Sequence, residues 1–154
     1  MRKKIIIITG ASRGIGLATA TAFAKDEKHL VVLISRNQEP LEQAKEKILD
    51  QYSQASIITR ALDVSDPVKV ADVFKGIYQE FNSIDVLFNN AAILQVKPIL
   101  EISDQDWQDV MNVNVNGVFY CAREAFRYMK TQKGFKHIIN MSSLAGVRGT
   151  EKFP

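Results

Sequence analysis

Apolar residues fall along the chain in short continuous runs that alternate with longer amphipathic stretches. Runs rich in Ile and Val, without regular polar alternation, occupy residues 5–9, 30–35, 55–62, 84–89 and 137–141. Such runs are typical of strands that are buried on both faces of a parallel sheet. The pattern therefore predicts a strand at each of these positions.

The intervals between the runs have helical spacing. Residues 14–25 are rich in Ala and Thr, which are small enough for close approach to a sheet. The next two intervals each predict one apolar helix face, made of Leu41, Ala44, Ile48 and Tyr52 in the first and of Val70, Val73, Phe74, Ile77, Tyr78 and Phe81 in the second. The longest predicted helix begins at Ser103 or Asp104, and its apolar stripe contains Trp107, Val110, Met111, Val115, Val118, Ala122, Ala125, Phe126 and Met129.

Strands and helices thus alternate from the first run to the last. This order is typical of an open α/β sheet with helices on both faces. Right-handed crossovers leave few topologies, and the usual Rossmann arrangement places the strands in the order 3-2-1-4-5. We therefore expect an α/β, Rossmann-like, doubly wound parallel sheet that stops after the fifth strand, with residues 1–154 in one domain.

Composition and charge narrow the class of protein. The 154 residues are 46% hydrophobic and 24% charged, which excludes a disordered tail, a collagen-like repeat and a disulfide scaffold. A net charge of +3, spread along the chain, gives little reason to expect nucleic-acid binding. The single cysteine, Cys121, fits a reducing compartment. Because no apolar run is long enough for a signal peptide or a membrane span, we expect a cytoplasmic protein without a membrane partner.

A glycine-rich turn joins the first predicted strand to the first helix, with the sequence Thr9-Gly10-Ala11-Ser12-Arg13-Gly14-Ile15-Gly16. Gly10 permits a sharp turn, Gly14 lets the backbone approach a pyrophosphate, and Gly16 lets the helix pack on the strand. The helix start also offers free N–H groups and the positive end of its dipole to phosphates. The spacing differs from the general dinucleotide fingerprint, and a purely structural turn is the alternative.

The end of the second strand bears on which dinucleotide would bind. An NAD site usually has Asp or Glu there to accept from the ribose 2′-OH, but this chain has Ser35 followed by Arg36. Arg36 and Arg13, the latter in the glycine turn, offer guanidinium groups to a 2′-phosphate. These residues favour NADP(H), and the alternative is that both arginines merely face solvent.

Other polar residues follow the later strands, where ligands bind in open α/β sheets. Asp63 is placed either to accept from an adenine amino group or simply to turn the chain. The amides of Asn89 and Asn90 suit a ribose or a tie between neighbouring strands, and Ser143 suits a site or a turn.

Asn114 lies on the apolar stripe of the longest predicted helix. A buried amide must find hydrogen-bond partners, so it binds water, bends the helix or is a satisfied core residue without a chemical role. We interpret Tyr120, Cys121 and the other aromatic residues of this helix as packing residues.

Taken together, these residues resemble the short-chain dehydrogenase/reductase family. The matching segments follow the family order: the glycine turn, Asp63-Val64, Asn89-Asn90-Ala91-Ala92, Asn114-Val115-Asn116-Gly117 and Ile139-Asn140-Met141-Ser142-Ser143. The resemblance implies an NADP(H)-binding Rossmann domain over residues 1–154 that is incomplete at its C-terminal end. It assigns catalysis to Asn114 and Ser143, and cofactor binding to Gly10, Ser12, Arg13, Gly14, Ile15, Gly16, Arg36, Asp63, Val64, Asn90 and Ala91.

The resemblance also implies an activity. It implies an NADP-dependent oxidoreductase that transfers a hydride between nicotinamide and a small carbonyl or alcohol substrate, such as a 3-oxoacyl thioester or another ketone. Ser143 would hold the carbonyl oxygen as charge develops on it, and Asn114 would hold a water of the proton relay. The complete protein is expected to be a homodimer or homotetramer that needs no metal.

The chain departs from the family pattern at two places. Ala92 stands where most members have glycine, and its Cβ crowds the backbone near the cofactor unless its φ is negative. Members place Tyr-x-x-x-Lys about a dozen residues after the serine, beyond Pro154 in this numbering. We therefore expect the 154-residue chain alone to have no reductase activity. The alternatives are a non-catalytic nucleotide-binding fragment or truncated-gene remnant, and a structural or interaction fragment.

Overall fold

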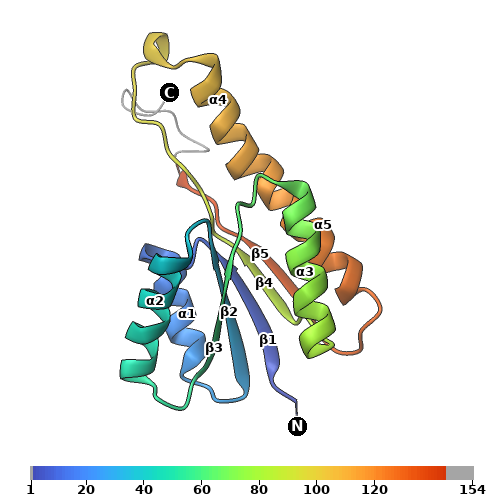
Figure 1. The fold of residues 1–154 in the computed structure, drawn as a ribbon. Coiled ribbons are helices and arrows are strands. Elements are labelled where there is room, and N and C mark those ends of the chain that lie inside the picture. Colours follow the sequence, from blue (N-terminus) through green and yellow to red (C-terminus); the bar gives the residue numbers. More distant parts are fainter. Residues whose placement is uncertain (1, 145–154) are drawn as a thin grey trace.

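The computed structural model describes residues 2–144, and these form one five-stranded parallel sheet between layers of helices (Figure 1). The strands are β1 (Lys4–Thr9), β2 (His29–Ser35), β3 (Ser56–Ala61), β4 (Val86–Asn89) and β5 (His137–Asn140). Their order is β3-β2-β1-β4-β5, and every neighbouring pair is parallel. The structure therefore confirms the predicted Rossmann-like sheet and its strand order.

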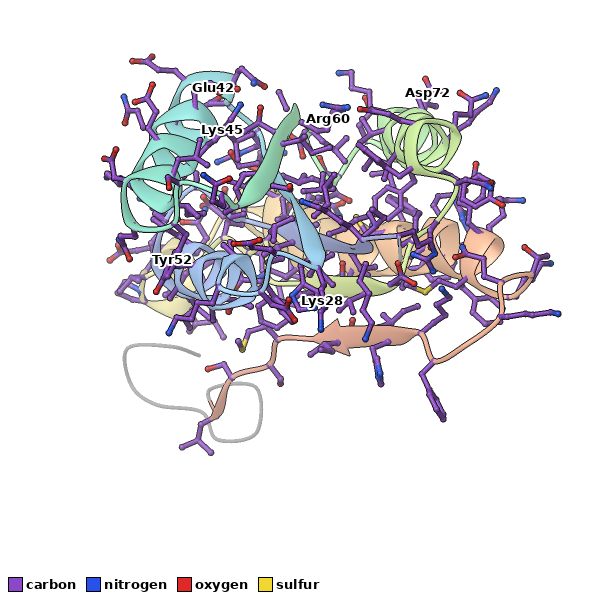
Figure 2. The ribbon with its side chains drawn as sticks, turned by 90° about the horizontal axis from the view of Figure 1, so that it is seen from below. Lys28, Glu42, Lys45, Tyr52, Arg60 and Asp72 are labelled. Atoms are coloured by element: carbon purple, nitrogen blue, oxygen red, sulfur yellow. The ribbon has the colours of Figure 1, made fainter. Side chains whose placement is uncertain are left out.

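Helices cover both faces of this sheet. On one side lie α1 (Gly14–Ala24) and α2 (Gln38–Gln51), and on the other lie α3 (Pro67–Phe81) and α5 (Gly117–Met129). Figure 2 shows Glu42 and Lys45 of α2 on one side and Asp72 of α3 on the other, with Arg60 of edge strand β3 between them. Within residues 2–144, no helix combines the length and the apolar character that a bilayer crossing needs.

The two faces of the sheet belong to two apolar clusters. Strand side chains alternate between faces, so Ile5 and Ile7 pack with Phe74 of α3, whereas Ile6 and Ile8 pack with Leu41 of α2. Cys121 of α5 is fully buried in the first cluster, and this burial raises the pKa of its thiol to about 12. The prediction that Cys121 is a packing residue is confirmed.

The longest predicted helix is interrupted by one π-helical turn, η2 (Asn112–Asn116), between α4 (Asp104–Met111) and α5. A π turn accommodates an extra residue, so the side chains before and after it do not share one stripe. The predicted stripe is accordingly wrong at Trp107, Val115 and Phe126, which are 50–59% exposed, and Phe119 is exposed as well. The exposure of Trp107 has a second cause, because α4, which carries it, projects beyond the sheet (Figure 1).

The start of α4 agrees with the prediction. Ser103 Oγ accepts from the Asp106 N–H at 3.1 Å, and Asp106 Oδ2 accepts from the Ser103 N–H at 3.0 Å, which is a capping box. Lys97 Nζ donates to the same carboxylate at 2.7 Å. The hydrogen bonds from Lys97 and then Ser103 lower the pKa of Asp106 to about 2. This ion pair fixes the segment between β4 and α4, which contains the short helix η1 (Ile99–Glu101).

A buried carboxylate, Asp85, holds the amino ends of the central strands together. Arg2 donates to its two oxygens at 2.6 and 2.8 Å, Lys136 Nζ donates at 2.5 Å, and the Ile5 N–H donates at 2.9 Å. Burial alone would raise the pKa of Asp85, but the hydrogen bonds from Arg2 and Lys136 outweigh it and hold that pKa well below its usual range. Asp85 thereby connects the N-terminal segment, β1 and the residue before β5.

Candidate cofactor-binding site

A cavity of about 300 Å³ lies at the carboxyl ends of the strands, the edge at which open α/β sheets bind ligands. It brings together all of the predicted cofactor-binding residues except Gly16, although they come from four separate stretches of sequence. Its lining consists of Gly10, Ser12, Arg13, Gly14, Ile15, Ser35, Arg36, Leu62, Asp63, Val64, Asn90, Ala91, Ala92, Ile93 and Val113.

Gly16 is absent from the lining because it packs beneath it. A Cβ at Gly16 would lie 2.3 Å from the carbonyl oxygen of Gly10, so only glycine lets α1 sit this close to the turn. Gly14 has a φ of +57° and lines the cavity. Arg13, the N-cap of α1, makes no side-chain capping bond, and the first turn of α1 contains no acidic residue. The backbone N–H groups of the first turn of α1 are therefore suited to bind an anion such as a phosphate.

Thr9 and Asn90 join the glycine turn to the end of β4. Thr9 Oγ1 accepts from the N–H groups of Asn90 and Ala91, both at 3.0 Å. Asn90 Nδ2 donates to the carbonyl oxygens of Thr9 at 3.1 Å and Gly10 at 3.2 Å. Of the two roles considered for this amide, the structure shows the tie between strands. Asn89 acts similarly, since its Nδ2 donates to Asn140 Oδ1 at 2.9 Å.

Arg13 and Arg36 are both exposed and both line the cavity. Among residues 2–144, neither guanidinium has a carboxylate partner. Most of the other arginines are committed to ion pairs, for example Arg60 with Glu80 at 2.6 Å. The cavity lining therefore contains two arginines without an ion-pair partner among residues 2–144, together with the carboxylate of Asp63.

Asp63 and Val64 form another part of the cavity wall, directly after β3. Asp63 Oδ1 accepts from the N–H of Ser65 at 3.0 Å and from its Oγ at 2.7 Å, so the turning role considered for Asp63 is present. Asp66 then caps α3 by accepting from the N–H groups of Val68 and Lys69. These bonds brace the β3–α3 turn against the cavity.

Asn114 lies in the π turn and does not line the cavity itself. Its Oδ1 accepts from the Ile93 N–H at 2.9 Å, and its Nδ2 donates to the Ile93 carbonyl oxygen at 2.8 Å. Ile93 does line the cavity, as does Val113. The amide therefore fixes part of the cavity wall through the backbone of another segment.

Ser143 lies three residues beyond Asn140, the last residue of β5, and is exposed. In the described part of the chain it is not among the residues that line the cavity.

The φ of Ala92 is not positive, so the Cβ that replaces the usual glycine hydrogen creates no left-handed strain. Alanine in place of the usual glycine is therefore harmless to the backbone conformation at position 92.

Sequence reasoning missed some of the residues that shape the cavity. Leu62 and Thr9 end or follow strands, so a stricter use of the strand-end rule would have included them. Ile93 and Val113 had no such signal, because their place in the wall depends on the path of the β4–α4 segment.

Comparisons with known proteins agree with this architecture. The family model described as short chain dehydrogenase matches residues 4–154. The 3-oxoacyl-[acyl-carrier-protein] reductase of Buchnera aphidicola is 32% identical over 145 residues, which are 94% of this chain and 57% of that protein. The chain thus spans little more than half the length of that relative.

Solved structures show the same fold. A metagenomic short-chain oxidoreductase in complex with NADP has a TM-score of 0.90 and 28% identity, with 99% of this chain and 68% of that chain covered. An NAD⁺-bound xylitol dehydrogenase has a TM-score of 0.86 and 30% identity, with 99% and 57% covered. Because the family model matches residues 4–154, nearly the whole of this chain, the chain belongs to the short chain dehydrogenase family.

Proposed function

We propose that the cavity binds NADP(H), with the glycine turn at the pyrophosphate and with Arg13 and Arg36 at the 2′-phosphate. The observation that carries this proposal is the pair of arginines, which line the same cavity as the glycine turn and have no carboxylate partner within residues 2–144. A phosphate dianion would satisfy both guanidinium groups with charge-assisted hydrogen bonds. Asp63 and Val64 then contact the adenine end.

Family membership alone leaves the choice of cofactor open, since the related structures include one with NADP and one with NAD⁺. An NAD site gains from a carboxylate just after β2 that accepts from the ribose 2′-OH. This chain has Ser35 and Arg36 there, and both line the cavity. A carboxylate would repel a 2′-phosphate, whereas Arg36 attracts it, so the local charge favours NADP(H).

We further propose that the complete protein interconverts a carbonyl and an alcohol. The bound nicotinamide supplies or accepts the hydride. Ser143 holds the carbonyl oxygen as negative charge develops on it. Each end of the Asn114 amide uses one of its two hydrogen bonds on Ile93, which leaves one lone pair and one N–H for a water of the proton relay. Relatives named as a 3-oxoacyl reductase and a xylitol dehydrogenase support this substrate class.

Residues 1–154 are, in this proposal, the N-terminal nucleotide-binding portion of a longer catalytic domain. The tyrosine and lysine that the family resemblance requires for proton transfer are not in the matching context within these residues. The 154-residue chain is therefore expected to bind the dinucleotide and to turn over nothing. A nucleotide-binding protein without catalysis is the second candidate, because the glycine turn, Arg36 and Asp63 already line one cavity, whereas Ser143 is not among the described residues that line it.

Two further properties belong to the proposal. Val115 in η2 and Phe119 and Phe126 in α5 are exposed, and we propose that a second copy covers them in a homodimer or homotetramer. A buried, unpaired Cys121 supports a cytoplasmic location. Sedimentation of the complete protein tests the first of these points.

The proposal is tested by titrating the 154-residue chain with NADPH and, in parallel, with NADH while nicotinamide fluorescence is followed. We expect saturable binding that is tighter for NADPH. The same preparation, freed of other reductases, should not oxidise NADPH when 3-oxoacyl thioesters or simple ketones are added. Absence of NADPH binding contradicts the proposed cofactor site, and ketone-dependent NADPH oxidation contradicts the proposed need for residues beyond the chain.

A further inference from the structure

Gly117, the first residue of α5, is in unusually close contact with the wall of the cavity. A Cβ built at Gly117 would lie 2.8 Å from Val64 Cγ2, and 3.2 Å from both the Cβ and the carbonyl oxygen of Val64. Gly76 in α3 is a helical glycine without this constraint, because a Cβ there would meet no atom of the described residues within 4 Å outside the helix's own backbone. The backbone of α5 thus rests directly on Val64.

Val64 lies between the helix and the cavity. It is 6% exposed and contributes to the cavity lining beside Asp63. Its branched side chain has a restricted χ1, and the turn that carries it is braced by the hydrogen bonds between Asp63 and Ser65. Val64 therefore has little freedom to move except toward the cavity.

The helix is also prevented from moving away from Val64. Asn114 lies three residues before Gly117, and both ends of its amide are bonded to the backbone of Ile93. Ile93 belongs to a different part of the same cavity wall. The segment that leads into α5 is consequently anchored at Asn114 by two hydrogen bonds, so we expect an added methyl group at Gly117 to displace Val64 rather than the helix.

We propose that Gly117 is a positioning residue for the nucleotide site. The missing side chain at Gly117 sets the position of Val64 and hence the width of the cavity at Asp63 and Val64. This inference rests on the proposed function, in which that end of the cavity receives the adenine. A side chain at position 117 would narrow the adenine end and weaken every ligand that contains adenosine.

The experiment compares the native chain with Gly117→Ala, Val64→Ala, the double variant and Gly76→Ala. The probes are NADPH and adenosine 2′,5′-bisphosphate, with affinities from calorimetry and folding checked by urea denaturation. We expect Gly117→Ala to weaken both ligands about tenfold or more, because overpacking a site of this kind is costly. Gly76→Ala should leave both affinities unchanged.

The double variant separates a positioning role from general damage to the fold, including the case in which Gly117→Ala alone fails to fold. Val64→Ala removes the Cγ2 atom at 2.8 Å but keeps the Val64 Cβ and carbonyl oxygen at 3.2 Å, so in that background Gly117→Ala should cost clearly less affinity than in the native background. Equal affinities for the native chain and Gly117→Ala, or the same loss in both backgrounds, would overturn the inference alone. If the native chain binds neither probe, the proposed function fails and this inference fails with it.

Discussion

Asn114 and Ile93 are joined by two hydrogen bonds, from the Ile93 N–H to Asn114 Oδ1 at 2.9 Å and from Asn114 Nδ2 to the Ile93 carbonyl oxygen at 2.8 Å. The side chain therefore satisfies a backbone donor and a backbone acceptor 21 residues away in sequence. It does so from inside a π turn, next to Val113, which lines the cavity with Ile93. This pair links the helix to the cavity wall.

Replacing Asn114 by alanine is expected to lower both stability and cofactor affinity. The substitution leaves the N–H and the carbonyl of Ile93 without their partners, which costs about 2 kcal/mol in the free energy of unfolding. The affinity for NADPH should fall as well, because Ile93 is part of the cavity wall. Urea denaturation and an NADPH titration measure the two effects.

Asn116→Ala is the matched control for this prediction. Asn116 lies in the same π turn and is half-buried, but among residues 2–144 its Nδ2 donates only to Asn112 Oδ1, at 3.0 Å. We expect its loss to cost less than about 0.5 kcal/mol and to leave NADPH affinity unchanged. Similar losses of stability and NADPH affinity for Asn114→Ala and Asn116→Ala would contradict the role given to the hydrogen bonds with Ile93.

Alanine at Gly16 and alanine at Gly14 are expected to lower the free energy of unfolding by different amounts. At Gly16 the new Cβ would meet the Gly10 carbonyl oxygen at 2.3 Å and Asn90 Nδ2 at 2.7 Å, so the free energy of unfolding should fall by about 3 kcal/mol. Around a Cβ added at Gly14 no described residue other than its chain neighbours and its own helix lies within 4 Å, and the left-handed backbone adds only about 1 kcal/mol of strain. Thermal denaturation should rank Gly16→Ala well below Gly14→Ala, and the reverse ranking would contradict the packing argument.

Stability at low pH should depend on Asp85. The pKa of this carboxyl is depressed in the folded chain relative to about 4 in the unfolded chain, so its ionised form stabilises the fold above that pH. This contribution is lost as the pH falls through the folded-state pKa. Asp85→Asn should therefore cost about 3 kcal/mol at neutral pH, because Arg2 and Lys136 lose their buried partner.

The pH profile distinguishes this ionic role from a packing role. Urea denaturation of both proteins over a series of pH values gives the stability gap between the native chain and Asp85→Asn. The gap should be constant near neutrality and should shrink steadily below about pH 4. A gap that does not change with pH would mean that the charge of Asp85 does not contribute.

Most of the fold could be predicted from the sequence because local pattern and global arrangement agree. The apolar runs became strands within one or two residues of their predicted limits, for example residues 55–62 against Ser56–Ala61. The predicted burial on both faces is wrong for β5, which is the edge strand of the sheet and leaves Ile139 44% exposed. The right-handed crossover rule then left the observed strand order as the usual one. The longest helix was the exception, because no local signal distinguishes a π turn from regular helix at Asn112–Asn116.

The candidate site was predictable where it follows strand ends. Gly10, Arg36, Asp63 and Asn90 all stand just after buried runs, and parallel strands place those positions at one edge. The contacts that hold the site in shape were not predictable, since the pairing of Asn114 with Ile93 and of Gly117 with Val64 depends on how α5 crosses the sheet. The exposure of Phe119 and Phe126 was not predicted either. Helix α5 has apolar residues on a buried face and on an exposed face, and the sequence pattern does not show which of them contact the sheet.

The most direct test of the NADP(H) site is the effect of Arg36→Ala on the ratio of the NADPH and NADH dissociation constants. Lys28→Ala is the control for loss of a positive charge, because Lys28 is exposed and is not among the residues that line the cavity. We predict that the native chain and Lys28→Ala prefer NADPH, and that Arg36→Ala weakens NADPH about 10- to 100-fold while NADH changes little. Equal affinity of the native chain for the two dinucleotides, unchanged by Arg36→Ala, would contradict the account.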